Sequence, residues 1–328
     1  MRDTKWRDGI YGLITGDALG VPVEFVTRQA LAANPVKGMR EYGTHSQPAG
    51  TWSDDSSMVL ATLASYVETG SIDFVDIMQR YLNWIKYGEY TPFHDTFDNG
   101  LTVERALERF ESGIAPLECG GNTEYDNGNG SLMRILPFCL YAVEKNYTEE
   151  KAIRLIHDAS RLTHRHKRSL IGCGLFLYCV MSLLGCIREQ REEMLEVSID
   201  SSGELKDRLK SGIRHGLEYY GKQEEYSEEA AHYSRLADFD AFVRLDESQI
   251  SSSGYVVDTL EAVLWCLSNS DSYETAVLKA VNLGDDSDTV GALTGALAGM
   301  FYGYESIPKN WIDKLKRREF IEEILREI

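Results

Sequence analysis

Apolar residues recur every three or four positions along most of this 328-residue chain, the spacing that places them on one face of an α-helix. Alternating runs of β-branched and aromatic residues, which are typical of strands, are scarce, and only seven prolines interrupt the pattern. The sequence therefore predicts an all-α fold. The predicted helices are 54–69, 73–87, 101–112, 130–144, 149–162, 168–187, 204–220, 256–268, 273–282 and 309–327.

Two helical stretches, near opposite ends of the chain, carry glycine at every fourth position. The glycines are Gly12, Gly16 and Gly20 in the first stretch and Gly291, Gly295 and Gly299 in the second. Each glycine costs a helix about 1 kcal/mol relative to alanine, so three in register indicate that something approaches the backbone closely. Tight packing between helices and direct contact with a ligand would both explain the spacing, and we favour packing.

No shift in composition divides the chain, so we expect a single domain over 1–328. The least periodic regions are 88–100, 114–128 and 221–253. The last of these is acidic and rich in Tyr and Ser, which fits an insertion or a lid over a site.

The charge balance excludes one class of partner. Lys and Arg number 34 against 52 Asp and Glu, so the net charge is −18. Nucleic-acid affinity depends on clustered cations that contact phosphates, and we therefore expect no nucleic-acid partner. The Glu-rich run 188–196 is expected to form a solvated surface.

Cysteine usage and hydropathy indicate a cytoplasmic protein. None of the six cysteines forms a CxxC pair, and most stand in apolar stretches, where cysteine acts as a small hydrophobic residue. The charged N-terminus lacks the apolar core of a signal peptide. The longest small-apolar stretch, 290–304, is shorter than the roughly 20 residues that cross a bilayer. We expect a monomer that does not contact a membrane.

The first motif with chemical content is Ser53-Asp54-Asp55 at the start of a predicted helix. Ser53 has the character of an N-cap, and acids in a first turn interact favourably with the helix dipole. Capping alone would therefore explain the motif. Two adjacent carboxylates and a hydroxyl are also hard-oxygen ligands that suit Mg²⁺ or Mn²⁺.

A second acidic motif, Asp285-Asp286-Ser287-Asp288-Thr289, leads into the other glycine-rich helix. Three aspartates within four residues repel one another, which makes them a poor choice for capping alone. A divalent cation would relieve that repulsion. Two such motifs at helix starts fit a two-metal centre better than two coincidental caps.

Two weaker patterns are compatible with a phosphorylated ligand. The glycine-rich turn Gly128, Asn129, Gly130 and Ser131 precedes a predicted helix, where backbone N–H groups could bind phosphate or ribose. His164 could donate to a phosphate oxygen. An ordinary turn and a structural histidine explain the same residues when each is considered alone.

Seven short motifs occur in a characteristic order. They are Gly16-Asp17-Ala18-Leu19-Gly20-Val21-Pro22-Val23-Glu24-Phe25, Ser53-Asp54-Asp55, Phe97-Asp98, Gly128-Asn129-Gly130-Ser131-Leu132-Met133-Arg134, Thr163-His164, Gly254-Tyr255-Val256 and Gly284-Asp285-Asp286-Ser287-Asp288-Thr289. This ordered set resembles the ADP-ribosylglycohydrolases, typified by the dinitrogenase reductase-activating glycohydrolase and the ADP-ribosylarginine hydrolases. The resemblance covers about positions 6 to 315.

The resemblance implies a compact orthogonal multi-helix domain with two Mg²⁺ or Mn²⁺ ions in a metal-lined cleft. It implies that the first ligand group is Ser53, Asp54 and Asp55, and that the second is Asp286, Asp288 and Thr289. Asp285 stands where the family often has glycine, so we do not count it as a ligand.

The resemblance also implies catalytic and substrate-binding roles. Glu24 matches the glutamate beside the metal centre, and Asp98 matches an aspartate implicated in acid–base work, although Asp98-Asn99-Gly100 departs from the commoner Asp-Ile-Gly. Both are candidates for the catalytic acid or base. The residues expected to line the ADP-ribose are Gly128, Asn129, Gly130, Ser131, His164 and Tyr255.

The implied reaction is hydrolysis at the anomeric carbon of the distal ribose, with an ADP-ribosylated protein or a small ADP-ribosyl compound as substrate. Arginine is the first choice of acceptor, because the segments 254–265 and 280–289 look most like the arginine-type branch. Serine-linked ADP-ribose, free ADP-ribosyl compounds and a modified base stay open.

Two other functions are open. An inactive family member would bind ADP-ribose without cleaving it, but the complete acidic motifs argue against this. An all-α metal-dependent nucleotide phosphohydrolase would commonly use His and Asp ligands together. This chain has seven His, and we expect none of them beside the acidic motifs.

Overall fold

The computed structural model describes residues 2–187 and 201–328, so the acidic run 188–196 lies outside the described residues. The described residues form helices, turns and two isolated bridges, with no strand among them, which confirms the all-α prediction. No helix in these ranges is long and apolar enough to cross a membrane. All six cysteines are free thiols.

The α-helices are α1 Arg2–Gly20, α2 Arg28–Ala33, α3 Asp54–Thr69, α4 Phe74–Tyr87, α5 Leu101–Glu111, α6 Leu136–Glu144, α7 Glu149–Arg161, α8 Lys167–Leu183, α10 Ser201–Gly221, α11 Ser227–Ala230, α12 Phe239–Phe242, α13 Val256–Ser268, α14 Tyr273–Val281, α15 Ser287–Tyr302, α16 Lys309–Ile312 and α17 Arg318–Arg326. Short 3-10 helices are η1 Val21–Val23, η2 Pro116–Glu118, η3 Glu124–Asp126, η4 Glu224–Tyr226, η5 Ala231–Ala237, η6 Glu247–Gln249 and η7 Tyr304–Ser306.

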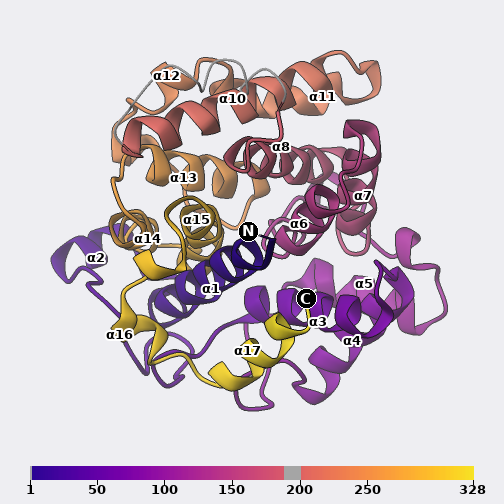
Figure 1. Ribbon diagram of the computed structural model, residues 1–328, viewed down its shortest axis with the longest axis horizontal. Helices are drawn as coiled ribbons and strands as arrows, with labels where there is room; N and C mark the ends of the chain where they lie inside the picture. Colours follow the sequence, from indigo (N-terminus) through magenta and orange to yellow (C-terminus); the bar gives the residue numbers. More distant parts are fainter. Residues whose placement is uncertain (1, 188–200) are drawn as a thin grey trace.

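Helices α1 and α15 run antiparallel through the middle of the molecule, with α8, α10 and α13 on one side and α3, α4 and α17 on the other (Figure 1). Their glycines face each other: a Cβ on Gly16 would lie 2.0 Å from the carbonyl oxygen of Gly291, and one on Gly12 would lie 2.2 Å from that of Gly295. Backbone therefore meets backbone along the pair. The preference for packing over ligand contact is confirmed for these glycines.

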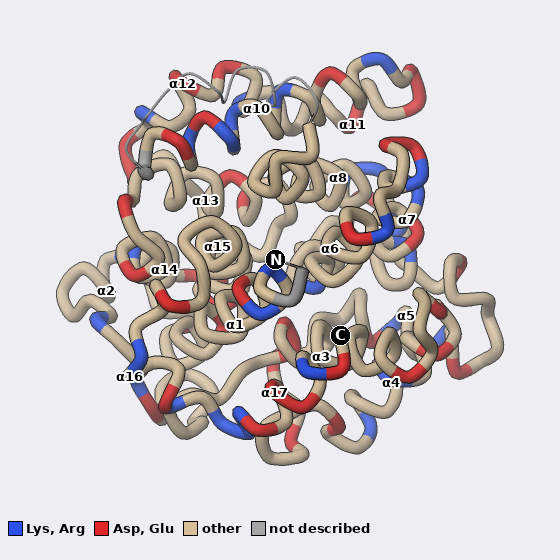
Figure 2. Tube along the Cα trace, in the orientation of Figure 1, with Lys and Arg blue, Asp and Glu red and all other residues tan. Residues whose placement is uncertain are grey.

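Charged residues are scarce in α15, which lies in the middle of the molecule, and frequent in the outer helices. Helix α15 has Asp288 as its one charged residue and is almost uniformly tan in Figure 2, whereas the outer helices α7, α10 and α17 are densely coloured. Buried apolar side chains from Trp6 in α1 to Ile324 in α17 belong to one hydrophobic cluster.

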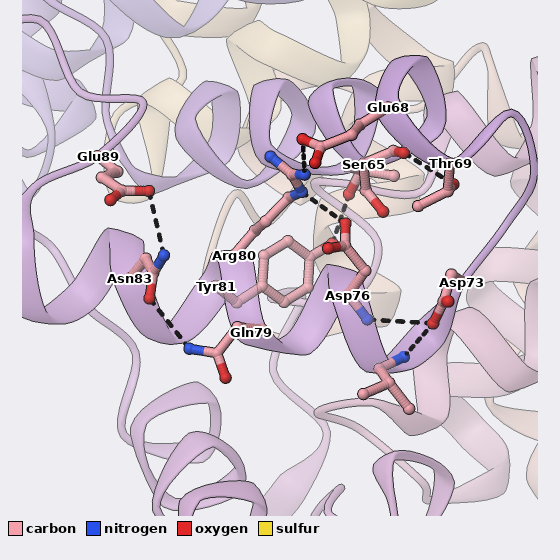
Figure 3. A network of polar contacts seen from close by, with 12 residues as sticks. Ser65, Glu68, Thr69, Asp73, Asp76, Gln79, Arg80, Tyr81, Asn83 and Glu89 are labelled. Atoms are coloured by element: carbon pink, nitrogen blue, oxygen red, sulfur yellow. Dashed lines mark hydrogen bonds and ion pairs between the residues drawn. The ribbon is translucent and has the colours of Figure 1, made fainter.

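Helix α4 is fixed to α3 by a polar network, shown in Figure 3. The Arg80 guanidinium donates from Nε to Asp76 at 2.6 Å and from one terminal nitrogen to Glu68 of α3 at 2.7 Å. The hydroxyls of Tyr81 and Thr62 are 2.6 Å apart in the buried interface. These contacts orient α3, the helix that begins with the first acidic motif.

Two predicted helices are shorter than expected. The pattern at 130–144 predicts a helix from residue 130, but α6 begins at Leu136, because Pro137 lacks a backbone N–H and is tolerated only in a first turn. The predicted helix 309–327 is broken into α16 and α17 by turns, with Arg317 at a φ of 41°. The segment 221–253 contains short helices whose Tyr233, Leu236 and Phe239 are buried. Its role as a lid stays a prediction.

Candidate active site

The first acidic motif is held in place by an aspartate from α1. Ser53 is the N-cap of α3, as predicted, and its Oγ accepts from the backbone N–H of Asp55 at 3.3 Å. Buried Asp17 accepts from the N–H of Ser53 at 2.9 Å and from the N–H of Ser56 at 3.1 Å. Asp17 and Ser53 thus satisfy the start of the helix. The Asp54 and Asp55 carboxylates are left for another role.

The second acidic motif also does little capping. Asp286 is the N-cap residue of α15, but its side chain makes no capping hydrogen bond. Instead Asp286 Oδ2 accepts from the Asn129 side-chain amide at 2.6 Å. Asp285 is exposed and has a φ of 52°, a conformation that glycine adopts most easily, which suits its exclusion from the ligand set.

The two acidic motifs meet although more than 200 residues separate them. The Thr289 hydroxyl of α15 donates to Asp55 of α3 at 3.3 Å. One oxygen each from Glu24, Asp286 and Asp288 lie within 4.8 Å of one another. The structure thus brings the predicted metal ligands and Glu24 together, whereas their coordination of ions stays a prediction.

Glu24, Asp54, Asp55, Asp286 and Asp288 form an acidic cluster, in which two carboxylate oxygens lack the partners that buried charges normally require. Asp55 Oδ2 and Asp288 Oδ2 are buried and have no hydrogen-bond partner. Burial raises the pKa of Asp54, Asp55 and Asp288 well above the ordinary range, and neighbouring carboxylates raise it further. Convergent hard-oxygen donors without partners are what Mg²⁺ or Mn²⁺ would satisfy, so the residues present fit divalent ions.

A histidine that no sequence pattern predicts lies beside this cluster. His45 Nε2 is hydrogen-bonded to the Glu24 carboxylate, and ligand atoms of Glu24, His45 and Asp98 lie within 4.8 Å of one another. The expectation that no His accompanies the acidic residues is therefore wrong. His45 comes from a loop without periodicity, and only tertiary contacts bring it to Glu24.

Asp98 lies at the less buried side of the cluster. Its φ is 60°, and burial followed by repulsion from Asp286 raises the pKa of its carboxyl to about 7. Glu24 is more deeply buried, and desolvation followed by the charges of Asp288 and Asp98 raises its pKa strongly.

The predicted ADP-ribose residues lie side by side. The Asn129 N–H donates to the Gly254 carbonyl at 2.9 Å, which joins the glycine-rich turn to the residue before Tyr255. A Cβ on Gly130 would lie 2.9 Å from the His164 ring. The turn is not itself a helix N-terminus, contrary to expectation, because α6 begins only at Leu136.

His164 is a buried, neutral imidazole. Burial, with the nearby Arg134 guanidinium, lowers the pKa of His164 to about 3. Its Nδ1 is 2.9 Å from the Thr163 hydroxyl, which accepts from Arg134 at 2.7 Å. Arg134 is fully buried, and no pattern in the sequence predicts its role here. The Ser131 hydroxyl accepts from Ser160 in the core, so a ligand contact at this position would come from its backbone.

Comparison with known proteins places the whole chain in one group. The family model described as ADP-ribosylglycohydrolase matches residues 2–328. The chain belongs to the ADP-ribosylglycohydrolase family. The predicted resemblance and fold are thus confirmed, as is the prediction of an enzyme that acts on ADP-ribosyl linkages.

Individual relatives agree with this assignment. The chain is 30% identical to the ADP-ribosylarginine hydrolase Tri1 of Serratia proteamaculans (strain 568), over 99% of this chain and 78% of that protein. It is 29% identical to the ADP-ribosyl-[dinitrogen reductase] glycohydrolase of Rhodospirillum rubrum, over 93% and 87%. A solved ADP-ribosylglycohydrolase-related protein complex aligns with a TM-score of 0.75 at 28% identity and covers 99% of this chain and 97% of its own.

A cavity of about 610 Å³ lies elsewhere in this ADP-ribosylglycohydrolase, beside α7, the start of α8 and the end of α10. Its lining includes Arg154, Lys167 and Tyr226 but none of the predicted site residues. The acidic cluster approaches solvent instead through the partly exposed Asp98 and Asp286 and the exposed Gly254.

Proposed function

We propose that this chain is a metal-dependent ADP-ribosylarginine hydrolase. The observation that carries the proposal is the meeting of the two acidic motifs, with two buried carboxylate oxygens that have no partner. The similarity to proteins named for hydrolysis of ADP-ribosylarginine and of ADP-ribosyl-[dinitrogen reductase] supports the arginine acceptor.

Two Mg²⁺ or Mn²⁺ ions are the proposed cofactors. Ser53, Asp54 and Asp55 would form one ligand group, and Asp286, Asp288 and Thr289 the other. When bound, such ions polarise oxygen ligands, lower the pKa of water and orient a substrate through its hydroxyls.

The residues beside Asp286 would hold the rest of the substrate. In the turn from Gly128 to Ser131, the backbone N–H groups other than that of Asn129 would donate to the ribose and diphosphate. His164 is neutral and can donate one ring N–H to a phosphate oxygen, although which nitrogen carries the proton follows from its partners. Tyr255 would contact the ligand by its ring or its hydroxyl.

Glu24 and Asp98 would move the protons. Water adds to the anomeric carbon as the carbon–nitrogen bond to the guanidine breaks, through an oxocarbenium-like transition state. Asp98, on the less buried side and with a pKa raised to about 7, is suited to protonate the departing guanidine. Glu24, which lies against Asp286 and Asp288, would accept the proton of the attacking water once bound cations offset the neighbouring charges that raise its pKa.

A release assay tests this function. ADP-ribosyl-arginine and ADP-ribosyl-serine are incubated side by side with the purified protein, with and without Mg²⁺. We expect ADP-ribose from the arginine compound only, and none after the metal is removed. Binding without release would indicate an inactive family member, and cleavage of the diphosphate would indicate a nucleotide phosphohydrolase. Either result would reject the proposal.

A further inference from the structure

Three rings stand beside the Glu24 and Asp98 pair, and the proposed mechanism uses none of them. The Phe25 and His45 ring centroids are 6.2 Å apart in an edge-on arrangement, and those of His45 and Phe97 are 4.8 Å apart. The three come from separate loops. We call Phe25, His45 and Phe97 the aromatic group.

Phe25 combines an exposed aromatic side chain with a strained backbone conformation, and neither feature stabilises the fold. Its side chain is 63% exposed, and its φ of 59° lies in the left-handed region, which is costly for a bulky residue. Backbone bonds hold it there: the Phe25 N–H donates to the Asp285 carbonyl at 2.7 Å, and the Asp285 N–H donates to the Val26 carbonyl at 3.2 Å. Backbone strain of this kind concentrates at functional sites.

The aromatic group and the residues proposed to bind diphosphate contact different carboxylates of the acidic cluster. Glu24 connects the two, because its carboxylate lies within 4.8 Å of ligand atoms of Asp286 and Asp288 and also of His45 and Asp98. Of the residues proposed to bind diphosphate, Asn129 contacts the cluster by donating to Asp286. With the diphosphate beside Asn129 and Asp286, the Asp98 and aromatic-group contacts of Glu24 remain for the leaving group of a ribose held at the cluster.

The aromatic rings of Phe25 and Phe97 suit contact with a planar cation. A guanidinium is weakly hydrated and stacks on aromatic faces, where cation–π attraction adds to the contact. A serine leaving group is uncharged and offers little area to a ring. We propose that Phe25 and Phe97 form the acceptor subsite and select a guanidinium-bearing acceptor. This inference rests on the proposed hydrolase function and specifies how the acceptor is recognised.

The chain offers a matched control in Tyr42. This residue is also aromatic, exposed (65%) and at a positive φ (53°), but it has no ring contact with the group. Glycine accepts positive φ without strain, so Phe25→Gly and Tyr42→Gly should both fold. Phe25→Trp keeps an aromatic face.

The test measures kcat and KM for ADP-ribosyl-arginine and, by calorimetry, the affinity for the product ADP-ribose. Phe25→Gly should raise KM about fivefold to thirtyfold, the size expected from loss of a cation–π contact. Its affinity for ADP-ribose should equal that of wild type, because the product lacks the guanidinium. Phe25→Trp should restore KM, and Tyr42→Gly should leave it unchanged.

Two failures are distinguishable. A wild-type protein that releases ADP-ribose from serine but not from arginine rejects the arginine hydrolase function and the subsite with it. Wild-type arginine activity combined with equal KM values for Phe25→Gly and Tyr42→Gly, or with weaker ADP-ribose binding by Phe25→Gly, overturns the subsite alone.

Discussion

Aspartates at two helix starts show that one residue type can have opposite effects on stability. Asp73 caps α4 by accepting from the N–H groups of Val75 and Asp76 at 2.9 and 3.1 Å. Asp288 accepts only from the N–H of Thr289, and its other oxygen has no partner. We expect Asp288→Ala to abolish hydrolysis while leaving the melting temperature of the metal-free protein unchanged or higher. Asp73→Ala should retain activity and cost about 1 kcal/mol. A large loss of metal-free stability in Asp288→Ala would contradict the ligand role.

Asp98 should make the stability of the metal-free protein depend on pH. Burial raises the pKa of its carboxyl to about 7 from the ordinary 3.8, so between these pH values the folded protein binds more protons than the unfolded chain. The free energy of unfolding then falls as pH rises through this window. Asp98→Asn cannot ionise, and its melting temperature should exceed that of wild type by more at pH 8 than at pH 5. Thermal scans of metal-stripped protein measure this. An equal difference at the two pH values would show that Asp98 titrates normally.

Tyr255 should contribute to binding rather than to folding. It precedes α13, its ring is partly exposed, and the Arg168 guanidinium lies 5.8 Å from the ring centroid. Tyr255→Ala should raise KM more than it lowers kcat, because a contact made equally in the ground and transition states is lost. Steady-state kinetics decide this, with circular dichroism as the check on folding. A variant that unfolds would show that the ring belongs to the core.

At the scale of elements, the α1–α15 pair should not tolerate side chains at its glycines. A Cβ on Gly16 would meet the Gly291 carbonyl, and neither backbone can move aside without separating the helices that carry Asp17 and Asp288. Gly16→Ala should cost about 3 kcal/mol or more, the upper range for overpacking. Gly221→Ala, where a Cβ meets nothing within 4 Å, should be nearly neutral. Urea denaturation of the Gly16→Ala and Gly221→Ala variants measures both changes in the free energy of unfolding. Similar midpoints would mean that the helices are not in close contact.

The local sequence pattern predicts the helices well, but it predicts few of the contacts between residues that are distant in sequence. Helices α3 and α13 have the predicted bounds, because apolar periodicity and capping are encoded within each segment. The residues Asp54, Asp55, Asp286 and Asp288 could be predicted to cooperate because repulsion within each motif needs a partner. No such local signal marks Asp17 and His45. Asp17 acts 36 residues away on Ser53, and His45 acts 21 residues away on Glu24, so only the folded chain reveals them.

For the molecule as a whole, metal removal should separate activity from folding. The hydrophobic cluster extends through helices from α1 to α17, so we expect one cooperative thermal transition and a monomer by light scattering. EDTA should abolish hydrolysis without unfolding the chain. Excess Mg²⁺ should raise the unfolding free energy by about 2.7 kcal/mol at a concentration 100 times its Kd. Unfolding by EDTA at room temperature, or two separate transitions, would contradict a preformed single-domain site.

The antiparallel pairing of α1 with α15 also determines the stage of protein synthesis at which the active site can first form. The Ser287 hydroxyl donates to the Gly20 carbonyl across 267 residues of sequence. At about 5 to 20 residues per second, a ribosome needs on the order of ten to fifty seconds to make that stretch. During this interval α1 has no partner helix, and no nascent chain that ends before Ser287 contains both acidic motifs. Catalytic competence therefore arises only after the second acidic motif has been made, and the glycine face of α1 is the surface that a chaperone would have to protect until then.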